Sequence, residues 1–227
     1  MARWLITGTG TDVGKTWVSE ALIRGWVAAG RTVGVLKPVL TGVDLSDAAS
    51  WASSDPGRLL LATGHDLTAD ALEAACPFHF KAPLSPDQAA EREGRTMSLS
   101  EVLQVVLQSH RPELQEFLVE GAGGVMSPLT ADATQLELWR RLGWPVVLVA
   151  GTYLGSLSHT LTALEVLGSQ AAGVILSPSP DAPVSVERHA ASLSRHLRVP
   201  IAHCARGQRE LPAALLDVWS ARFKVGS

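Results

Sequence analysis

Short apolar runs alternate with longer amphipathic segments along most of the chain. The runs are rich in β-branched residues, which is typical of buried strands. They begin after residue 3 and recur at residues 32–36, 117–119, 146–150 and 173–176. The run at 146–150 is apolar at every position, as expected of a strand covered on both faces of a parallel sheet.

The segments between these runs carry apolar residues at helical spacing. We predict helices at residues 15–29, 86–93, 98–110, 133–142, 157–167, 184–197 and 210–219. In the first of them, Val18, Leu22, Trp26 and Val27 are expected to form one buried face. Ser98 or Ser100 is the expected N-cap of the third. Strands alternating with helices predict an α/β fold with a doubly wound, mostly parallel sheet flanked by helices.

Two stretches lack a regular pattern. Residues 41–68 are small and polar, and we expect a loop with a short helix there, with Asp55-Pro56-Gly57 as a break. Residues 77–86 contain three prolines, and we expect a surface loop.

Composition narrows the class of protein. The 227 residues, 46% of them hydrophobic and 18% charged, are enough for one substantial core, so we predict a single domain over residues 1–227. The net charge of −3 and the absence of a basic block argue against nucleic acid or an anionic membrane as partner. The two cysteines, Cys76 and Cys204, lack metal-ligand spacing. With no signal peptide and no run of membrane-spanning length, a cytoplasmic location is expected.

The loop from Gly8 to Thr16, after the first strand, ends in Gly-Lys-Thr and is typical of a phosphate-binding loop, which makes the fold P-loop NTPase-like. In such a loop backbone N–H groups and a helix N-terminus bind phosphate oxygens, Lys15 adds positive charge and the Thr16 hydroxyl can bind Mg²⁺. The usual motif has glycine where this chain has Thr9, so a glycine-rich turn without a ligand is the alternative.

Two further strand ends carry candidate residues. Lys37 follows the strand at 32–36, and Glu120 follows the strand at 117–119 and precedes Gly-Ala-Gly-Gly. Ligands bind such sheets beyond the carboxyl ends of the strands, so we expect both to converge on the phosphate loop. Glu120 and Asp55 are candidate Mg²⁺ ligands beside Thr16. Each of these residues also has a non-functional interpretation when it is considered alone. Lys37 could be a surface lysine, Glu120 could end a strand at a turn, and Asp55 could form a turn.

Together these residues resemble the dethiobiotin synthetase family over most of the chain. The resemblance rests on the phosphate loop and five further motifs: Lys37-Pro38-Val39, Thr41-Gly42, Ser54-Asp55, Pro83-Leu84-Ser85-Pro86, and Val119-Glu120-Gly121-Ala122-Gly123-Gly124 followed by Pro128-Leu129. It implies ATP-dependent closure of a ureido ring, in which CO₂ or bicarbonate bridges the two amines of 7,8-diaminononanoate through a carbamate and a carbamic–phosphoric anhydride. It also implies Mg²⁺ as cofactor, ATP as substrate and a homodimer.

The resemblance implies roles for individual residues. Lys37, Lys15 and Thr11 would be catalytic. Substrate would be bound by Thr11, Lys37, Thr41, Tyr153 and Leu154, the last two at a helix N-terminus that accepts the diamine's carboxylate across the dimer interface. Mg²⁺ would be held by Thr16, Asp55 and Glu120. The nucleotide would be bound by Asp12, Val13, Gly14, Lys15, Thr16, Trp17, Asp55, Glu120, Gly121, Ala122, Gly123 and Ser177.

The chain departs from the family pattern at several positions. Gly10 and Asp12 stand where an aspartate and a glutamate are common, and Ser177-Pro178 replaces an Asn-Asp pair whose amide reads adenine. Ala205-Arg206 replaces an Ile-Pro pair. We therefore expect weak discrimination among nucleoside triphosphates.

Three alternatives to an active synthetase remain. A switch ATPase of the partitioning or cell-division type usually has a further lysine where this chain has Gly10, and some have a basic terminal helix, which residues 211–220 do not form. A glutamine-dependent amidotransferase would need a glutaminase domain. An inactive paralogue would not need to retain Lys15, Thr16, Lys37 and Glu120.

Overall fold

The computed structural model describes residues 2–205 and 207–225, and its centre is a six-stranded sheet of parallel strands in the order β2-β5-β1-β6-β7-β8. The strands are β1 (Ala2–Gly8), β2 (Val33–Leu36), β5 (Glu116–Glu120), β6 (Val146–Gly151), β7 (Ala171–Ser177) and β8 (Ile201–His203). After β1 the chain first fills one side of the sheet and then, from β6, the other. Ligands bind such sheets beside the strand at which this change of direction occurs.

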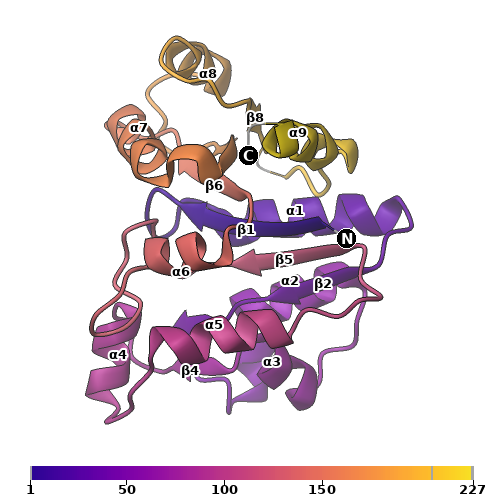
Figure 1. Ribbon diagram of the computed structural model, residues 1–227, viewed down its shortest axis with the longest axis vertical. Coiled ribbons are helices and arrows are strands. Elements are labelled where there is room, and N and C mark those ends of the chain that lie inside the picture. The colour runs from indigo at the N-terminus through magenta and orange to yellow at the C-terminus, as the bar shows by residue number, and fades with distance from the viewer. Residues whose placement is uncertain (1, 206, 226–227) are drawn as a thin grey trace.

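Helices cover both faces of the sheet, and in Figure 1 α5 and α6 cross in front of it while α1 and α2 lie behind. One apolar cluster joins the sheet to α4 (Pro86–Arg92), α5 (Leu99–Gln108), α6 (Gln135–Leu142), α7 (Ser156–Leu167) and α8 (Val186–Ser194). The other joins it to α1 (Lys15–Ala28), α2 (Asp55–Thr63) and α9 (Ala214–Val225). Alternate strand residues supply the two clusters, as in Phe117 and Leu118. The doubly wound parallel fold is therefore confirmed.

The stretch after β2 contains small elements that the sequence pattern did not reveal. β3 (Val39–Thr41) pairs in parallel with β4 (Phe78–Phe80) in a separate two-stranded sheet. The expected surface loop at 77–86 is therefore partly wrong, since β4 lies within it. The 3-10 helices η1 (Ala48–Ser53) and η2 (Gly168–Gln170), and the helix α3 (Ala69–Ala75), complete the elements.

Three further expectations need correction. Asp55-Pro56-Gly57 is the first turn of α2 and not a break, because the Ser54 hydroxyl accepts a hydrogen bond from the Gly57 amide and proline is tolerated in a first turn. Val27 is 38% exposed, so it lies outside the buried face formed by Val18, Leu22 and Trp26. The last helix runs over Ala214–Val225 and not 210–219, since Pro212 precedes it. Ser98 is confirmed as the N-cap of α5.

Arg31 joins the amino end of the sheet to α9. Its guanidinium donates to the buried Glu116 at 2.6 Å and to Asp217 of α9 at 2.9 Å, while Trp4 Nε1 donates to the second oxygen of Glu116 at 3.2 Å. None of the described helices is long and apolar enough to cross a membrane.

Arg31→Ala should lower the free energy of unfolding by about 3 kcal/mol, because it leaves the buried Glu116 carboxylate without its cation. Asp217→Ala removes only the exposed partner and should cost less than about 1 kcal/mol. Urea unfolding curves of both variants check this expectation. Equal losses for the two variants would contradict it.

Candidate active site

The phosphate-binding loop leads directly from β1 into α1. Gly14 is the N-cap of α1 with φ of 94°, and no side chain caps the helix there. Asp12 is the non-glycine residue with positive φ, at 58°, among those described. The backbone N–H groups of the first helical turn are therefore available to an anionic ligand, and the helix dipole favours negative charge at the same place.

Lys15 lies folded over this loop. Its ammonium group donates to the Gly10 carbonyl at 2.8 Å, and only 7% of the residue is exposed. Burial and the nearby charge of Lys37 lower the pKa of Lys15 to about 8. The ammonium group is therefore still charged at neutral pH, although a further cation lies close by.

Two carboxylates and a hydroxyl meet beside Lys15. The Thr16 hydroxyl lies 2.7 Å from Asp55 Oδ1 and 2.9 Å from Glu120 Oε1. Ser19, one helical turn further along α1, donates to Glu120 Oε2 at 2.7 Å, and Glu120 is completely buried. The single proton of the Thr16 hydroxyl can be donated to only one of the two carboxylates at a time. The other carboxylate oxygen therefore lacks a hydrogen bond from Thr16.

Lys37 completes this cluster from the neighbouring strand. The register pairs Leu36 with Val119, which places Lys37 beside Glu120. Its ammonium group lies 2.8 Å from both Glu120 Oε1 and Asp55 Oδ2 and donates to the Gly121 carbonyl at 3.2 Å. Burial alone would lower the pKa of Lys37, but the two carboxylates raise it well above its usual range. Lys37 is only 3% exposed, so the surface-lysine alternative is wrong.

Asp55 reaches the cluster because α2 begins at this residue. Burial opposes its charge, but Lys37 and the Thr16 hydroxyl hold the pKa of the Asp55 carboxyl below its usual range. The Asp55 carboxyl is therefore ionised at neutral pH beside the charged Lys37. The expected convergence of the phosphate loop, Lys37 and Glu120 is confirmed, with Asp55 added from the helix α2.

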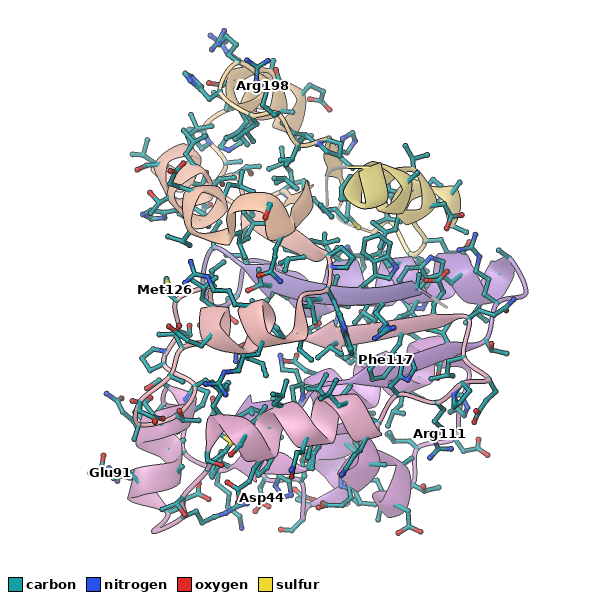
Figure 2. The ribbon with its side chains drawn as sticks, in the orientation of Figure 1. Asp44, Glu91, Arg111, Phe117, Met126 and Arg198 are labelled. Atoms are coloured by element: carbon teal, nitrogen blue, oxygen red, sulfur yellow. The ribbon has the colours of Figure 1, made fainter. Side chains whose placement is uncertain are left out.

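The glycine loop after β5 packs directly against the phosphate-binding loop. The Val125 amide donates to the Gly8 carbonyl at 3.1 Å. A Cβ atom on Gly124 would lie 3.3 Å from Gly10 Cα and 3.3 Å from the Gly8 carbonyl oxygen, whereas a Cβ atom on Gly10 would meet nothing within 4 Å. Figure 2 shows Met126 of this loop at the carboxyl end of β5, on the opposite side of the molecule from Arg111.

Two cavities open beside these residues. The first has a volume of about 660 Å³, and Pro83, Leu84, Ser85 and Pro86 contribute to its lining. It is also lined by the predicted site residues Thr11, Asp12, Gly14, Lys15, Thr16, Trp17, Lys37, Thr41, Asp55, Ala122 and Gly123. The second measures about 510 Å³ and is lined by the predicted residues Thr11, Asp12, Val13, Gly14, Trp17, Tyr153 and Ser177.

Three predicted residues lie outside these linings. Glu120 is completely buried and contacts the lining residues Thr16 and Lys37. Gly121 is covered by Gln135 and Trp139, with which a Cβ atom would collide, and it contributes its carbonyl to Lys37. Leu154 is 88% exposed at the N-terminus of α7 and lines neither cavity. Arg206 lies outside the described residues.

The structure adds residues that sequence reasoning missed. Ser19 follows Thr16 by three positions, so helical spacing alone could have placed it on the same face. Arg58 follows Asp55 by three positions and lines both cavities. It was missed because Asp55-Pro56-Gly57 was interpreted as a break.

No cluster of three or more His, Cys, Asp or Glu side chains in the described part of the chain is arranged to hold a metal. The candidate metal ligands are the carboxylates of Asp55 and Glu120 and the Thr16 hydroxyl, which meet at 2.7 and 2.9 Å. This set suits Mg²⁺, which prefers oxygen ligands, needs only one or two carboxylates and keeps several waters.

Comparisons with known proteins agree on fold and family. An AAA domain family model (AAA_26) matches residues 2–209. The ATP-dependent dethiobiotin synthetase BioD of Methylobacterium nodulans is 43% identical over 96% of this chain and 99% of its own length. The protein of the same name from Phenylobacterium zucineum is 43% identical over 99% of this chain and 98% of its own length.

Among solved structures, the MinC:MinD cell division protein complex of Aquifex aeolicus has a similar fold, with a TM-score of 0.52. The sequence identity is 13%, and the match covers 98% of this chain and 86% of that chain. At this identity the likeness concerns the fold alone.

Proposed function

Because this chain belongs to the ATP-dependent dethiobiotin synthetase family, we propose that it closes the ureido ring of dethiobiotin from 7,8-diaminononanoate, CO₂ and ATP. The observation that carries the proposal is the meeting of Lys15, Lys37, Thr16, Asp55 and Glu120 beside one cavity of about 660 Å³. We further propose that residues 1–227 form one synthetase domain.

The phosphate-binding loop would hold the triphosphate. The first-turn amides of α1 and the Lys15 ammonium group would face the phosphate oxygens, with the Lys15 contact to Gly10 exchanged for one to phosphate. The contact residues we propose are those from Asp12 to Trp17, together with Gly121, Ala122, Gly123 and Ser177.

This role of Lys15 predicts a dependence of ATP affinity on pH. Because the pKa of Lys15 is about 8, the side chain loses its charge as the pH rises past that value. Phosphate binds the charged form, so ATP affinity should fall above pH 8, approaching a slope of about tenfold per pH unit. Titration calorimetry from pH 7 to 10 checks this, and Lys15→Gln should remove the slope. The same slope in both proteins would contradict it.

Thr16, Asp55 and Glu120 would hold Mg²⁺. Their oxygens lie 2.7 and 2.9 Å apart, Glu120 is fully buried, and hard oxygen ligands suit this ion. When bound, Mg²⁺ would neutralise charge on the phosphate oxygens. The chain's own residues fix the orientation of the ligands, since Ser19 holds the second oxygen of Glu120.

Lys37 would stabilise the negative charge that develops between the two substrates. One amine attacks CO₂ and loses a proton to give a carbamate, whose oxygen attacks the γ-phosphorus as the bond to ADP breaks. The second amine then attacks the carbonyl carbon and expels phosphate. Carbamate and phosphate are both anionic, so bringing them together in a water-poor site requires cations at fixed positions. Buried and held by two carboxylates, Lys37 is fixed in this way.

The diamine would occupy the larger cavity, with Thr11 and Thr41 positioning it near Lys37. We propose a homodimer in which Tyr153 and Leu154 of one protomer receive the diamine's carboxylate on the other. The exposure of Leu154 and the uncapped N-terminus of α7 at Gly155 support this arrangement. A cytoplasmic location and small-molecule substrates, without nucleic acid or membrane partners, are part of the same proposal.

The second cavity would hold the base, and it predicts weak nucleotide selection. Ser177 and Ser179 lie in its lining, and a hydroxyl can both donate and accept, so it can pair with different base edges. We expect ATP, CTP and GTP to give similar turnover constants in a diamine-dependent phosphate-release assay. A strong preference for ATP would contradict this expectation.

The experiment for the proposed function is phosphate release from ATP and Mg²⁺ with and without 7,8-diaminononanoate and bicarbonate, combined with mass spectrometry of the product. Diamine-dependent release and a product with one added carbonyl bridge would support the synthetase. Release without the diamine, stimulated by DNA or lipid, would instead favour a switch ATPase.

A further inference from the structure

Arg58 stands between the two cavities. Thr11, Asp12, Gly14, Trp17 and Arg58 line both cavities, and among these shared residues Arg58 alone comes from outside the phosphate-binding loop and the start of α1. A ligand that extends through both cavities would therefore lie beside Arg58 as well as beside that loop.

The side chain is held in place by a buried partner. Arg58 Nη2 donates to Glu20 Oε2 at 2.6 Å, and Glu20 is only 5% exposed. The Arg58 side chain is 33% exposed and forms an ion pair with Glu20. A guanidinium group has five N–H donors, so most of them are left to contact a ligand.

Two helices place this pair beside the metal-ligand candidates. Thr16 and Glu20 lie one turn apart on α1, and Asp55 and Arg58 lie one turn apart on α2. The contact between Thr16 and Asp55 and the contact between Glu20 and Arg58 are thus successive rungs between the same two helices. The guanidinium is therefore displaced by about one helical turn from the oxygen cluster.

The charges of the two site lysines and of a bound triphosphate can be compared. Lys37 already bridges Asp55 and Glu120, and Lys15 lies on the phosphate-binding loop itself. A nucleoside triphosphate bound along the loop would carry several negative charges, and planar guanidinium groups bind phosphate oxygens in pairs.

We propose that Arg58 of α2 binds the polyphosphate chain of the nucleotide in addition to the loop amides, with Glu20 as its positioning residue. The proposal rests on the proposed function for the nucleotide, and it adds a phosphate contact from α2 that separates the two cavities when ATP is bound.

The test compares the affinities of ATP and AMP in the full-length protein by titration calorimetry, with Mg²⁺ and without the diamine. Arg58→Ala should weaken ATP binding by roughly tenfold to a hundredfold, the range for hydrogen bonds to charged groups, and leave AMP binding unchanged. Arg58→Lys should recover part of the loss, since it keeps the charge but not the planar fork.

Arg24→Ala is the matched control. Arg24 is also 33% exposed and also pairs with Glu20, at 3.2 Å, but it lines neither cavity. It should leave ATP binding unchanged. If Arg58→Ala lowers the thermal midpoint too far for titration, Arg58→Gln, which retains most of the side-chain stem, takes its place.

Unchanged ATP affinity in the Arg58 variants, or an equal loss of ATP and AMP affinity, would overturn the proposal. Because this assay contains no diamine, its outcome is separate from that of the synthetase assay. Wild-type protein that makes no ring-closed product while Arg58→Ala still loses ATP affinity would refute the synthetase function and leave the phosphate contact standing.

Discussion

Replacing Lys37 by alanine is expected to lower turnover by roughly a hundredfold to a thousandfold, the usual effect of removing one fixed electrostatic donor from an active site. The nucleotide affinity should change much less, because we assign phosphate binding to the loop amides and Lys15. The loss should therefore appear in kcat, measured as diamine-dependent phosphate release at saturating ATP. Intact turnover in Lys37→Ala would show that the assigned role is wrong.

The variant also leaves two carboxylates without their shared cation, so its stability needs a separate measurement. Asp55 and Glu120 would repel one another, and thermal unfolding with and without Mg²⁺ will show whether the ion offsets this. Lys81→Ala is a suitable control, because Lys81 is 65% exposed, pairs with Asp44 and lines neither cavity. It should leave turnover unchanged.

Glu120→Gln should raise the Mg²⁺ concentration needed for half-maximal activity by at least roughly tenfold to a hundredfold, since even outer partners of metal ligands have effects of this size. The amide keeps the shape of the side chain but lacks the charge. Its NH₂ group would also face donors on Thr16, Ser19 or Lys37. Activity titrated with Mg²⁺ and manganese binding followed by electron paramagnetic resonance both measure the effect.

Glu116→Gln gives the matched control for this variant. Glu116 begins the strand that Glu120 ends, is also buried, and contacts Arg31 and Trp4 at the opposite edge of the sheet. It should lower stability without changing the Mg²⁺ requirement. If both variants shifted the Mg²⁺ requirement equally, Glu120 would have no direct part in binding the ion.

The sheet could be predicted from the sequence because its central strands are apolar at consecutive positions. The run from Val146 to Ala150 has no other stable location than a strand covered on both faces. β4 and β8 could not be predicted, because three residues carry too little periodicity to separate a strand from a loop. The start of α2 was misinterpreted because Pro56-Gly57 can indicate a turn as well as a first helical turn.

Within the site, residues at strand ends were easier to predict than residues on helices. Lys37 and Glu120 follow apolar runs directly, so parallel topology alone brings them together. Ser19 and Arg58 depend on where a helix begins and on which face a position occupies, and the interpretation of Asp55-Pro56-Gly57 as a break misplaces the start of the helix that carries Arg58. Under the proposed homodimer, the role of Leu154 would depend on a second protomer, which no pattern within one chain can locate.

The contact between the two glycine loops bears on how this sequence can drift over evolution. A Cβ atom at position 124 would crowd the backbone atoms of Gly8 and Gly10, which are not flexible side-chain ends, whereas a Cβ atom at position 10 would meet no atom within 4 Å. The two glycines therefore differ in how well they would tolerate a side chain, although they lie against one another. A side chain could therefore be gained at position 10 without disturbing the loop, whereas a side chain at position 124 would require the backbone at Gly8 and Gly10 to shift by a few tenths of an ångström.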